Sequence, residues 1–148
     1  MTEQHRIMVL IVEDNPADAR LVKTLVEETG FPISITILRD GEGAIQFLAL
    51  AAKGELPEPD LILLDINLPK KNGHEVLASI RKNGMLSNIY VAMCSGSNSE
   101  EDFAKARRNK ANAYFIKPMG SEEMEAMVTG LRDILFSVSE GAEISRSF

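Results

Sequence analysis

The feature that constrains this chain most is a short apolar run that ends on an aspartate. Residues 61–64 read Leu-Ile-Leu-Leu and lead directly into Asp65. Apolar residues without alternation predict a strand buried on both faces, as in a parallel sheet that carries helices on either side. Open sheets of this kind place their chemistry at the carboxyl ends of the strands. Asp65 is therefore either the point where a buried strand meets water or a placed reactive group.

Strand character recurs four more times, and each strand is followed by a helical pattern. Asn15 and Pro16 form a helix start, Gly30 stops the helix that follows, and Ser121 is expected to cap the last helix. Such alternation predicts an α/β fold with one doubly wound sheet of five parallel strands, right-handed crossovers and helices on both faces. The expected strands are residues 6–12, 33–38, 61–64, 89–94 and 113–116, the second of them near an edge.

Length and composition limit the classes of function. The chain has 148 residues, enough for one domain with a real core. Its net charge of −6 argues against nucleic acid as a direct partner. It contains no apolar run of membrane-spanning length and no recognisable signal peptide. Because Cys94 is the single cysteine, an intrachain disulfide is ruled out, and we expect a cytoplasmic protein without membrane contact.

Polar residues at the strand ends form the candidate site. They are Glu13 and Asp14 after the first strand, Asp65 after the third, Ser95 after the fourth and Lys117 after the fifth. Parallel strands end at one edge of the sheet, so these side chains are expected to converge. Three carboxylates repel one another unless a cation is present, and hard oxygen ligands suit Mg²⁺. A cation, an ammonium and a hydroxyl around a carboxylate suit phosphoryl transfer, with Asp65 as the nucleophile that becomes an aspartyl phosphate.

The order and spacing of these residues resemble the response-regulator receiver domain of two-component signalling, which has a flavodoxin-like (βα)5 fold. The resemblance covers about residues 6–136. Its motifs are Val12-Glu13-Asp14-Asn15, Leu64-Asp65-Ile66-Asn67-Leu68-Pro69, Asn72-Gly73, Ser95, Tyr114 and Lys117-Pro118. It implies a receiver domain over residues 1–136 with Asp65 as the phosphoacceptor. It also implies that the protein is not an enzyme beyond catalysing its own phosphorylation and dephosphorylation.

The resemblance assigns roles to the residues around Asp65. It implies a Mg²⁺ site made of Glu13, Asp14, Asp65 and the main-chain carbonyl of Asn67. Ser95 and Lys117 would contact the phosphoryl oxygens, and the bond between Lys117 and Pro118 would be cis. Tyr114 is similar to the aromatic switch whose rotamer follows phosphorylation.

Several details are similar to the small stand-alone receivers that serve phytochrome-type histidine kinases. They are the segment Glu-Asp-Asn-Pro-Ala-Asp at residues 13–18, the long loop before the third strand, residues 97–102 and a tail without an output domain. One position departs from the wider family, in which threonine is often followed by alanine or threonine. This chain has Ser95-Gly96, which keeps the hydroxyl but loosens the loop that must close on the phosphoryl group.

The implied partner is a sensor histidine kinase, with the signal passed on by protein contacts or onward phosphotransfer. Residues 137–148 follow the last helical pattern and include Val138, Ile144 and Phe148. A purely solvating tail does not need these apolar side chains, so we predict a dimerisation arm in a two-fold homodimer. The alternative is a frayed terminus.

Two other functions use a related fold or related chemistry. A phosphatase of the haloacid-dehalogenase type would need a second acidic residue where this chain has Asn67. A flavodoxin-like cofactor binder would need a glycine-rich phosphate loop after the first strand. The chain has Glu-Asp-Asn-Pro at residues 13–16, and its carboxylates would repel a phosphate.

The remaining reactive residue types have ordinary explanations. Cys94 is expected to be a small buried apolar residue. His5 and His74 are expected at the surface, with no partner at metal-ligand spacing. The basic residues at 105–110 suit the exposed carboxyl end of a helix.

Overall fold

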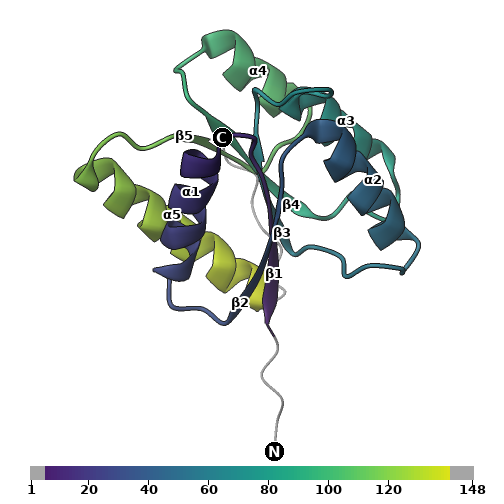
Figure 1. Cartoon of the computed structure of the whole chain (residues 1–148), viewed down its shortest axis with the longest axis horizontal. Coiled ribbons are helices and arrows are strands. Elements are labelled where there is room, and N and C mark those ends of the chain that lie inside the picture. The colour runs from purple at the N-terminus through teal and green to yellow at the C-terminus, as the bar shows by residue number, and fades with distance from the viewer. Residues whose placement is uncertain (1–5, 141–148) are drawn as a thin grey trace, which may run out of the picture.

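A sheet of five parallel strands forms the centre of the molecule, in the order β2-β1-β3-β4-β5 (Figure 1). The structure is a computed structural model that describes residues 6–140. Its strands are β1 Ile7–Val12, β2 Ile33–Leu38, β3 Leu61–Asp65, β4 Tyr90–Ser95 and β5 Ala113–Ile116. The predicted α/β architecture is confirmed, and so is the edge position of β2.

In residues 6–140, five helices connect or follow these strands and cover both faces of the sheet. They are α1 Pro16–Glu27, α2 Gly41–Ala52, α3 Gly73–Lys82, α4 Glu100–Arg108 and α5 Ser121–Ser139. Figure 1 shows α1 and α5 on one face and α2, α3 and α4 on the other. This is the doubly wound arrangement that right-handed crossovers produce.

Each face of the sheet carries its own apolar core, and β3 contributes to both. Leu61 and Leu63 pack in the cluster under α1 and α5, whereas Ile62 and Leu64 pack in the cluster under α2, α3 and α4. Successive side chains of a strand point to opposite faces, so a strand covered on both sides needs apolar residues at every position. The unbroken apolar run in the sequence follows from this geometry.

Side-chain caps start the first four helices. The capping residues are Asn15, Asp40, Asn72 and Ser99, whose side chains accept hydrogen bonds from backbone N–H groups of the first turn. The prediction that Ser121 caps α5 was wrong. The capping position is Gly120, which offers no side-chain hydrogen bond, and the helix therefore begins one residue earlier than expected.

The last helix is longer than the sequence pattern indicates. It continues past the expected end near Phe136 to Ser139, because Val138 still packs against the core under α1 and α5. Ile144 and Phe148 of the expected dimerisation arm lie outside the described residues.

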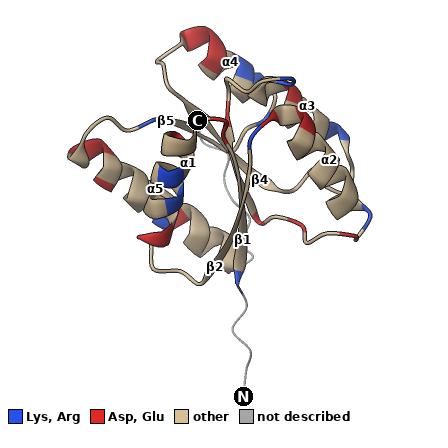
Figure 2. Ribbon diagram, in the orientation of Figure 1, with Lys and Arg blue, Asp and Glu red and all other residues tan. Residues whose placement is uncertain are grey.

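The charges on α4 follow its helix dipole. Figure 2 shows acidic residues at the start of α4 and basic residues toward its end. The acidic ones are Glu100, Glu101 and Asp102, and the basic ones are Lys105, Arg107 and Arg108. Opposite charges at the two ends complement the partial charges of the helix termini.

Within residues 6–140, no helix combines the length and apolar character needed to cross a bilayer.

A close approach of α3 to β3 positions the candidate site. The N–H of Gly73 donates to the carbonyl of Ile66 over 2.8 Å. A Cβ atom on Gly73 would collide with the backbone carbonyl oxygen of Asp65. Glycine is therefore required for the start of α3 to lie directly on the end of β3.

Candidate functional site

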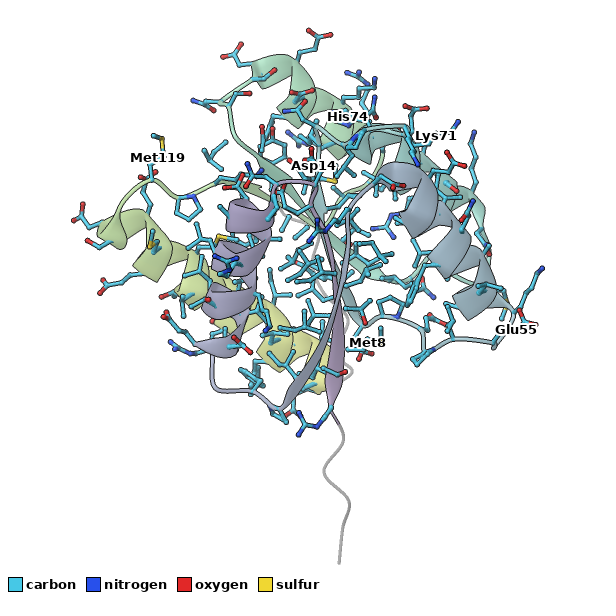
Figure 3. All side chains as sticks on the ribbon, in the orientation of Figure 1. Met8, Asp14, Glu55, Lys71, His74 and Met119 are labelled. Carbon is cyan, nitrogen blue, oxygen red and sulfur yellow. The ribbon has the colours of Figure 1, made fainter. Side chains whose placement is uncertain are left out.

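The strand order brings the predicted site residues to one edge of the sheet. Val12, the last residue of β1, is paired with Leu64, so Glu13 follows β1 beside Asp65 at the end of β3. Asp65 is paired with Cys94 on its other side. Figure 3 shows Met8 toward one end of the sheet and Asp14 beyond the other. Convergence of the strand ends, which the sequence predicted, is confirmed.

An acidic group lies at this edge. Ligand atoms of Glu13, Asp14 and Asp65 all lie within 4.8 Å of one another. Glu13 and Asp65 are only 3% and 4% exposed, whereas Asp14 is exposed to solvent. One open side and two buried carboxylates match a hard cation that keeps part of its water shell.

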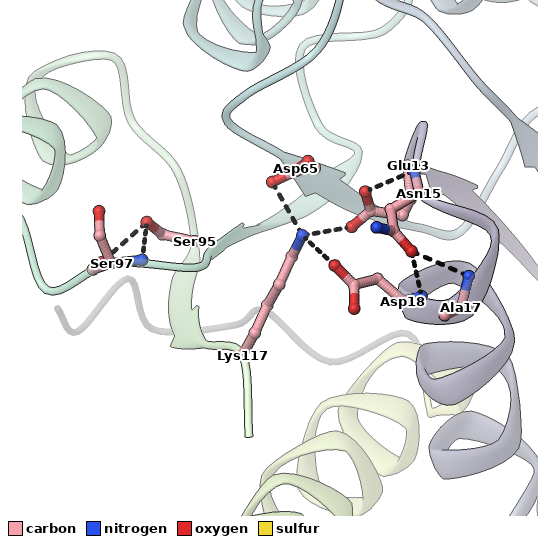
Figure 4. Close-up of polar contacts among 8 residues, drawn as sticks. All are labelled: Glu13, Asn15, Ala17, Asp18, Asp65, Ser95, Ser97 and Lys117. Carbon is pink, nitrogen blue, oxygen red and sulfur yellow. Dashed lines mark hydrogen bonds and ion pairs between the residues drawn. The ribbon is translucent and has the colours of Figure 1, made fainter. Parts of the chain in front are cut away.

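Lys117 places its ammonium among three carboxylates (Figure 4). Its Nζ lies 2.6 Å from Oε1 of Glu13, 3.0 Å from Oδ2 of Asp18 and 3.5 Å from Oδ1 of Asp65. The backbone of β5 aims the side chain, because the N–H of Lys117 donates to the carbonyl of Ser95 over 2.8 Å. One fixed positive charge therefore partly compensates the acidic group.

Asn15 ties the end of β1 to the start of α1. Its side-chain Oδ1 accepts hydrogen bonds from the N–H of Ala17 at 2.9 Å and of Asp18 at 3.0 Å. Its own N–H donates to Oε2 of Glu13 over 3.1 Å. The helix cap and the orientation of Glu13 thus depend on the same residue.

Burial raises the pKa of both buried carboxyl groups. The pKa of Glu13 rises to about 7, mainly because burial disfavours its charge and also because Asp65 repels it. Hydrogen bonds from Lys117 and Asn15 oppose this rise. The pKa of Asp65 is raised by burial as well, against the opposing effects of Lys117, Glu13 and the backbone of Asn67. Burial therefore shifts both carboxyl groups toward their neutral forms.

Lys117 stays protonated in these surroundings. Burial would lower its pKa, but hydrogen bonds to Glu13 and Asp18 and the charge of Asp65 together raise it. The side chain is 19% exposed, so the ammonium is mostly enclosed by its carboxylate partners.

Ser95 lies at the predicted edge, but its hydroxyl points elsewhere. Its Oγ donates to the carbonyl of Ser97 over 2.8 Å and accepts from the N–H of Ser97 over 3.2 Å. Figure 4 shows this pair apart from Lys117 and Asp65. The serine is fully buried, and its hydroxyl must leave the carbonyl of Ser97 before it can donate to a group on Asp65.

Tyr114 lies on β5 and is half buried. Its ring packs edge-on against Phe103 of α4, with centroids 5.3 Å apart and an angle of 70° between the planes. This contact connects the strand that precedes Lys117 with the exposed surface of α4. The role of Tyr114 as a switch stays a prediction.

Two expectations that came with the family resemblance have different outcomes. The peptide bond between Lys117 and Pro118 is trans, since residues 6–140 contain no cis bond, so the predicted cis bond was wrong. The intrinsic preference of bonds before proline for the trans form is small. The sequence alone is therefore a poor guide to whether such a bond is cis or trans. Asn67 lies exposed in the loop after β3, and its carbonyl as a metal ligand stays a prediction.

No role was expected for Asp18 from the sequence. It lies three residues after the cap Asn15, in the first turn of α1, and its partner Lys117 is 99 residues away. The available signal was its position: an acidic residue in the first helical turn after a strand-end carboxylate faces the same edge of the sheet.

The residues present fit a divalent cation. The group supplies only carboxylate oxygens, which Mg²⁺ and similar hard ions prefer. Oδ1 of Asp65 is buried and accepts no hydrogen bond in the described part of the chain, where the ammonium of Lys117 forms a long ion pair with it at 3.5 Å. A buried oxygen without a hydrogen-bond donor is costly unless a cation or another group compensates it.

Comparison with known proteins decides the family. The model of the response regulator receiver domain matches residues 9–129. The chain belongs to this receiver family. It is thus a phosphoacceptor protein of two-component signalling, as the sequence predicted.

Two curated receivers are similar over most of their length. The response regulator Rcp1 of Synechocystis is 39% identical over 125 residues, which is 84% of this chain and 85% of that protein. The probable methanogenesis regulatory protein FilR2 of Methanothrix harundinacea is 38% identical over 126 residues, which is 85% of this chain and 81% of that protein.

Solved receiver structures have the same fold. The Mn²⁺-bound form of Rcp1 is 38% identical, has a TM-score of 0.77 and covers 86% of this chain and 92% of its own. The phosphorylated cyanobacterial phytochrome response regulator RcpA is 31% identical, has a TM-score of 0.79 and covers 95% of this chain and 99% of its own. Receivers linked to phytochromes are therefore among its relatives.

Proposed function

We propose that this receiver accepts a phosphoryl group on Asp65 from the phosphohistidine of a sensor histidine kinase. The observation that carries the proposal is the surroundings of Asp65. This buried carboxylate lies at a strand end, in one acidic group with Glu13 and Asp14, and 3.5 Å from the ammonium of Lys117. Clustered carboxylates around a buried nucleophile repel one another and cost folding stability. Such a cluster is expected at a functional site, where a bound ligand compensates the repulsion.

Transfer of the phosphoryl group from the phosphohistidine to Asp65 needs no other reactant. An oxygen of the Asp65 carboxylate forms a bond to phosphorus while the phosphorus–nitrogen bond of the donor breaks. The electron pair of that bond leaves with the imidazole nitrogen. The product is an acyl phosphate, and its hydrolysis by water returns Asp65 to its carboxylate and releases inorganic phosphate. The same residues that stabilise the transfer also serve this self-dephosphorylation.

Mg²⁺ is the proposed cofactor. Glu13, Asp14 and Asp65 would hold it together with the main-chain carbonyl of Asn67. When bound, the ion supplies charge neutralisation for the transferring phosphoryl group. The relative Rcp1 has a Mn²⁺-bound form, which supports a divalent cation at the acidic group here.

Lys117 and Ser95 are the proposed contacts to the phosphoryl oxygens. Lys117 already lies beside Asp65 and contributes positive charge where the phosphoryl group brings negative charge. Ser95 reaches the group only if its hydroxyl leaves Ser97. That movement would free space near Tyr114 and alter the surface of α4, β5 and α5, which makes the response a two-state change biased by the phosphoryl group.

The proposed partner is a phytochrome-type histidine kinase in the cytoplasm. The relative RcpA is a phytochrome response regulator and supports this class of kinase. The methanogenesis regulator FilR2 is about as similar in sequence as Rcp1 is, so the choice of kinase needs a direct test. The output is proposed to be a protein contact or onward phosphotransfer. A phosphotransfer assay with a phytochrome kinase, under red and far-red light, tests the choice of kinase.

A homodimer is the proposed assembly, with residues 141–148 contributing an arm. The boundary for a truncation test follows from α5, which runs to Ser139 with Glu140 as its cap. A chain that ends at Glu140 keeps the helix intact and should shift toward monomer in light scattering. Equal mass for the truncated and full-length proteins at all concentrations would show that the arm has no part in assembly.

The phosphoacceptor is tested with Asp65→Asn. The amide keeps the shape of the side chain but is a poor nucleophile. We expect labelling of the wild-type protein by acetyl phosphate and by a kinase, and none of the variant, with an unchanged circular dichroism spectrum. Full labelling of Asp65→Asn would refute the assignment.

A further inference from the structure

The ammonium of Lys117 and the acidic group share two carboxylates. Lys117 contacts Glu13, Asp18 and Asp65, and the group that could hold a metal consists of Glu13, Asp14 and Asp65. Oxygens that coordinate a divalent cation have less charge to offer an ammonium. Binding of a cation therefore weakens two of the three ion pairs that Lys117 makes with the part of the chain that the structure describes. Asp18 is the remaining contact, and it is not a member of the acidic group.

We propose that Asp18 is a positioning residue for Lys117. It retains the ammonium beside Asp65 when Glu13 and Asp65 are engaged by a cation, so that Lys117 meets the incoming phosphoryl oxygens. This inference rests on the proposed function, because it assigns Asp18 a part in the same transfer.

The fold holds Asp18 in place through the helix cap. Asn15 accepts the N–H of Asp18 at 3.0 Å and donates its own N–H to Glu13 at 3.1 Å. Glu13 and Asp18 then both contact Lys117, at 2.6 and 3.0 Å, which closes a ring of contacts. The start of α1 also favours a carboxylate electrostatically. Figure 4 shows these contacts, with the ammonium of Lys117 as one member of the ring.

Because Asp18 is partly exposed, its ion pair with Lys117 is weak enough for the ammonium to move. The side chain of Asp18 is 39% exposed, compared with 3% for Glu13. Water screens an exposed ion pair, so it is weaker than a buried pair of the same length. Lys117 can therefore shift toward Asp65 when the acyl phosphate forms. In that step the oxygen–phosphorus bond forms, the bond from phosphorus to the donor breaks, and its electron pair leaves with the donor.

The test compares two changes at Asp18 with a matched control. Asp18→Ala removes the contact, and Asp18→Asn keeps an oxygen that can accept the hydrogen bond of Lys117. Glu27→Gln removes one charge at the other end of the same helix, on an exposed residue. Phosphorylation rates are measured against acetyl phosphate concentration at saturating Mg²⁺, and Mg²⁺ affinity is measured by calorimetry without a phosphodonor.

We expect Asp18→Ala to lower the maximal rate about tenfold, the effect of losing one charge-assisted hydrogen bond of modest strength. The half-saturating concentration of acetyl phosphate should change less. Mg²⁺ affinity should also fall, because Lys117 then competes more strongly for Glu13 and Asp65. Asp18→Asn should recover part of the rate, and Glu27→Gln should match the wild type in both measurements.

Failure of the inference and failure of the proposed function give different results. If wild-type protein is labelled at Asp65 while Asp18→Ala matches Glu27→Gln in rate and in Mg²⁺ affinity, the positioning role is overturned. If Asp18→Asn is as slow as Asp18→Ala and neither changes Mg²⁺ affinity, it is overturned as well. If wild-type protein is not labelled by any phosphodonor, the proposed function itself fails.

Discussion

His74 and Asp102 join the first turns of two helices through a half-buried contact. Nε2 of His74 lies 3.0 Å from Oδ1 of Asp102, and because a carboxylate only accepts, the imidazole nitrogen is the donor. His74 is 5% exposed, contrary to its predicted place at the surface. The contact links α3, which starts on the backbone of Asp65, to α4, which carries Phe103.

Removal of this contact should destabilise the fold. Asp102→Ala leaves Nε2 of the buried His74 without its acceptor, and we expect a loss of about 1–3 kcal/mol in the free energy of unfolding. Urea titration at neutral pH measures it. Glu101→Ala is the control, since Glu101 is an exposed acid in the same helical turn. Equal losses in the two variants would show that the histidine contact contributes nothing.

The acidic group should cost stability when no metal is present. Asp14→Ala removes one of three carboxylates that lie within 4.8 Å of one another. In metal-free buffer we expect the melting temperature to rise by roughly 2–4 °C, the change that about 1 kcal/mol produces in a domain of this size. Phosphorylation should be lost in the same variant.

The control for Asp14→Ala is Glu55→Ala, which removes an exposed acid far from Asp14 (Figure 3). It should leave the melting temperature in metal-free buffer unchanged. Added Mg²⁺ should stabilise the wild type and the control but not Asp14→Ala. A lower melting temperature for Asp14→Ala than for the control would show that repulsion in the acidic group is not significant.

The raised pKa of Glu13 predicts a pH dependence of stability. In the folded protein its pKa is about 7, against an ordinary value of 4.5, so between these values the folded state binds more protons than the unfolded state. Stability is then fully present below about pH 4.5 and falls as the pH rises through 7. The full shift corresponds to at most about 3 kcal/mol.

Chemical unfolding in chelator at several pH values between 5 and 8 measures this slope. Glu13→Gln should reduce this slope, because the amide does not titrate, and the raised pKa of Asp65 accounts for the slope that remains. Mg²⁺ binds the ionised carboxylate, so its affinity should increase over the same interval and its binding should release protons. A wild-type slope as flat as that of Glu13→Gln would contradict the prediction.

The sequence was informative wherever local pattern and topology act together. The apolar run at residues 61–64 predicted a strand covered on both faces, and its neighbours predicted the rest of the sheet. Parallel strands end at one edge, so Glu13, Asp65 and Lys117 could be placed together before any contact was known. Function followed from those positions and from the family resemblance.

Contacts between distant helices were not predictable in the same way. His74 was expected at the surface because its partner Asp102 lies 28 positions later on another helix. The contact of Asp18 with Lys117 spans 99 positions and depends on how α1 leaves the sheet. The direction of the Ser95 hydroxyl depends on the conformation of one loop, which residue types do not determine.

The close packing of α3 on β3 should tolerate no side chain at Gly73. In Gly73→Ala the added Cβ would collide with the carbonyl oxygen of Asp65, so α3 must shift. We expect a loss of about 1–3 kcal/mol in the free energy of unfolding, as for other overpacked sites. Gly96→Ala is the control, because a Cβ there meets no atom within 4 Å. Equal stability of both variants would contradict this account of the packing.

Tyr114 should report phosphorylation, because it lies on the strand that leads to Lys117 and its ring packs against Phe103 of α4. The chain has two tyrosines, Tyr90 and Tyr114, so incorporation of 3-fluorotyrosine gives two fluorine resonances. Tyr90 is paired with Leu61 at the start of β3, the end of the sheet opposite Asp65. A beryllofluoride phosphoryl mimic with Mg²⁺ should shift the resonance of Tyr114 and leave that of Tyr90 in place.

Ser95→Ala separates the switch from simple occupancy of the site. The alanine cannot donate a hydrogen bond to the mimic, so the closed conformation of the loop after β4 loses a stabilising contact. The space for Tyr114 is then not created. The variant should bind the mimic with a smaller shift at Tyr114, and Asp65→Asn should show no shift. An unmoved Tyr114 resonance in wild-type protein with Asp65 fully modified would mean that the ring does not follow the site.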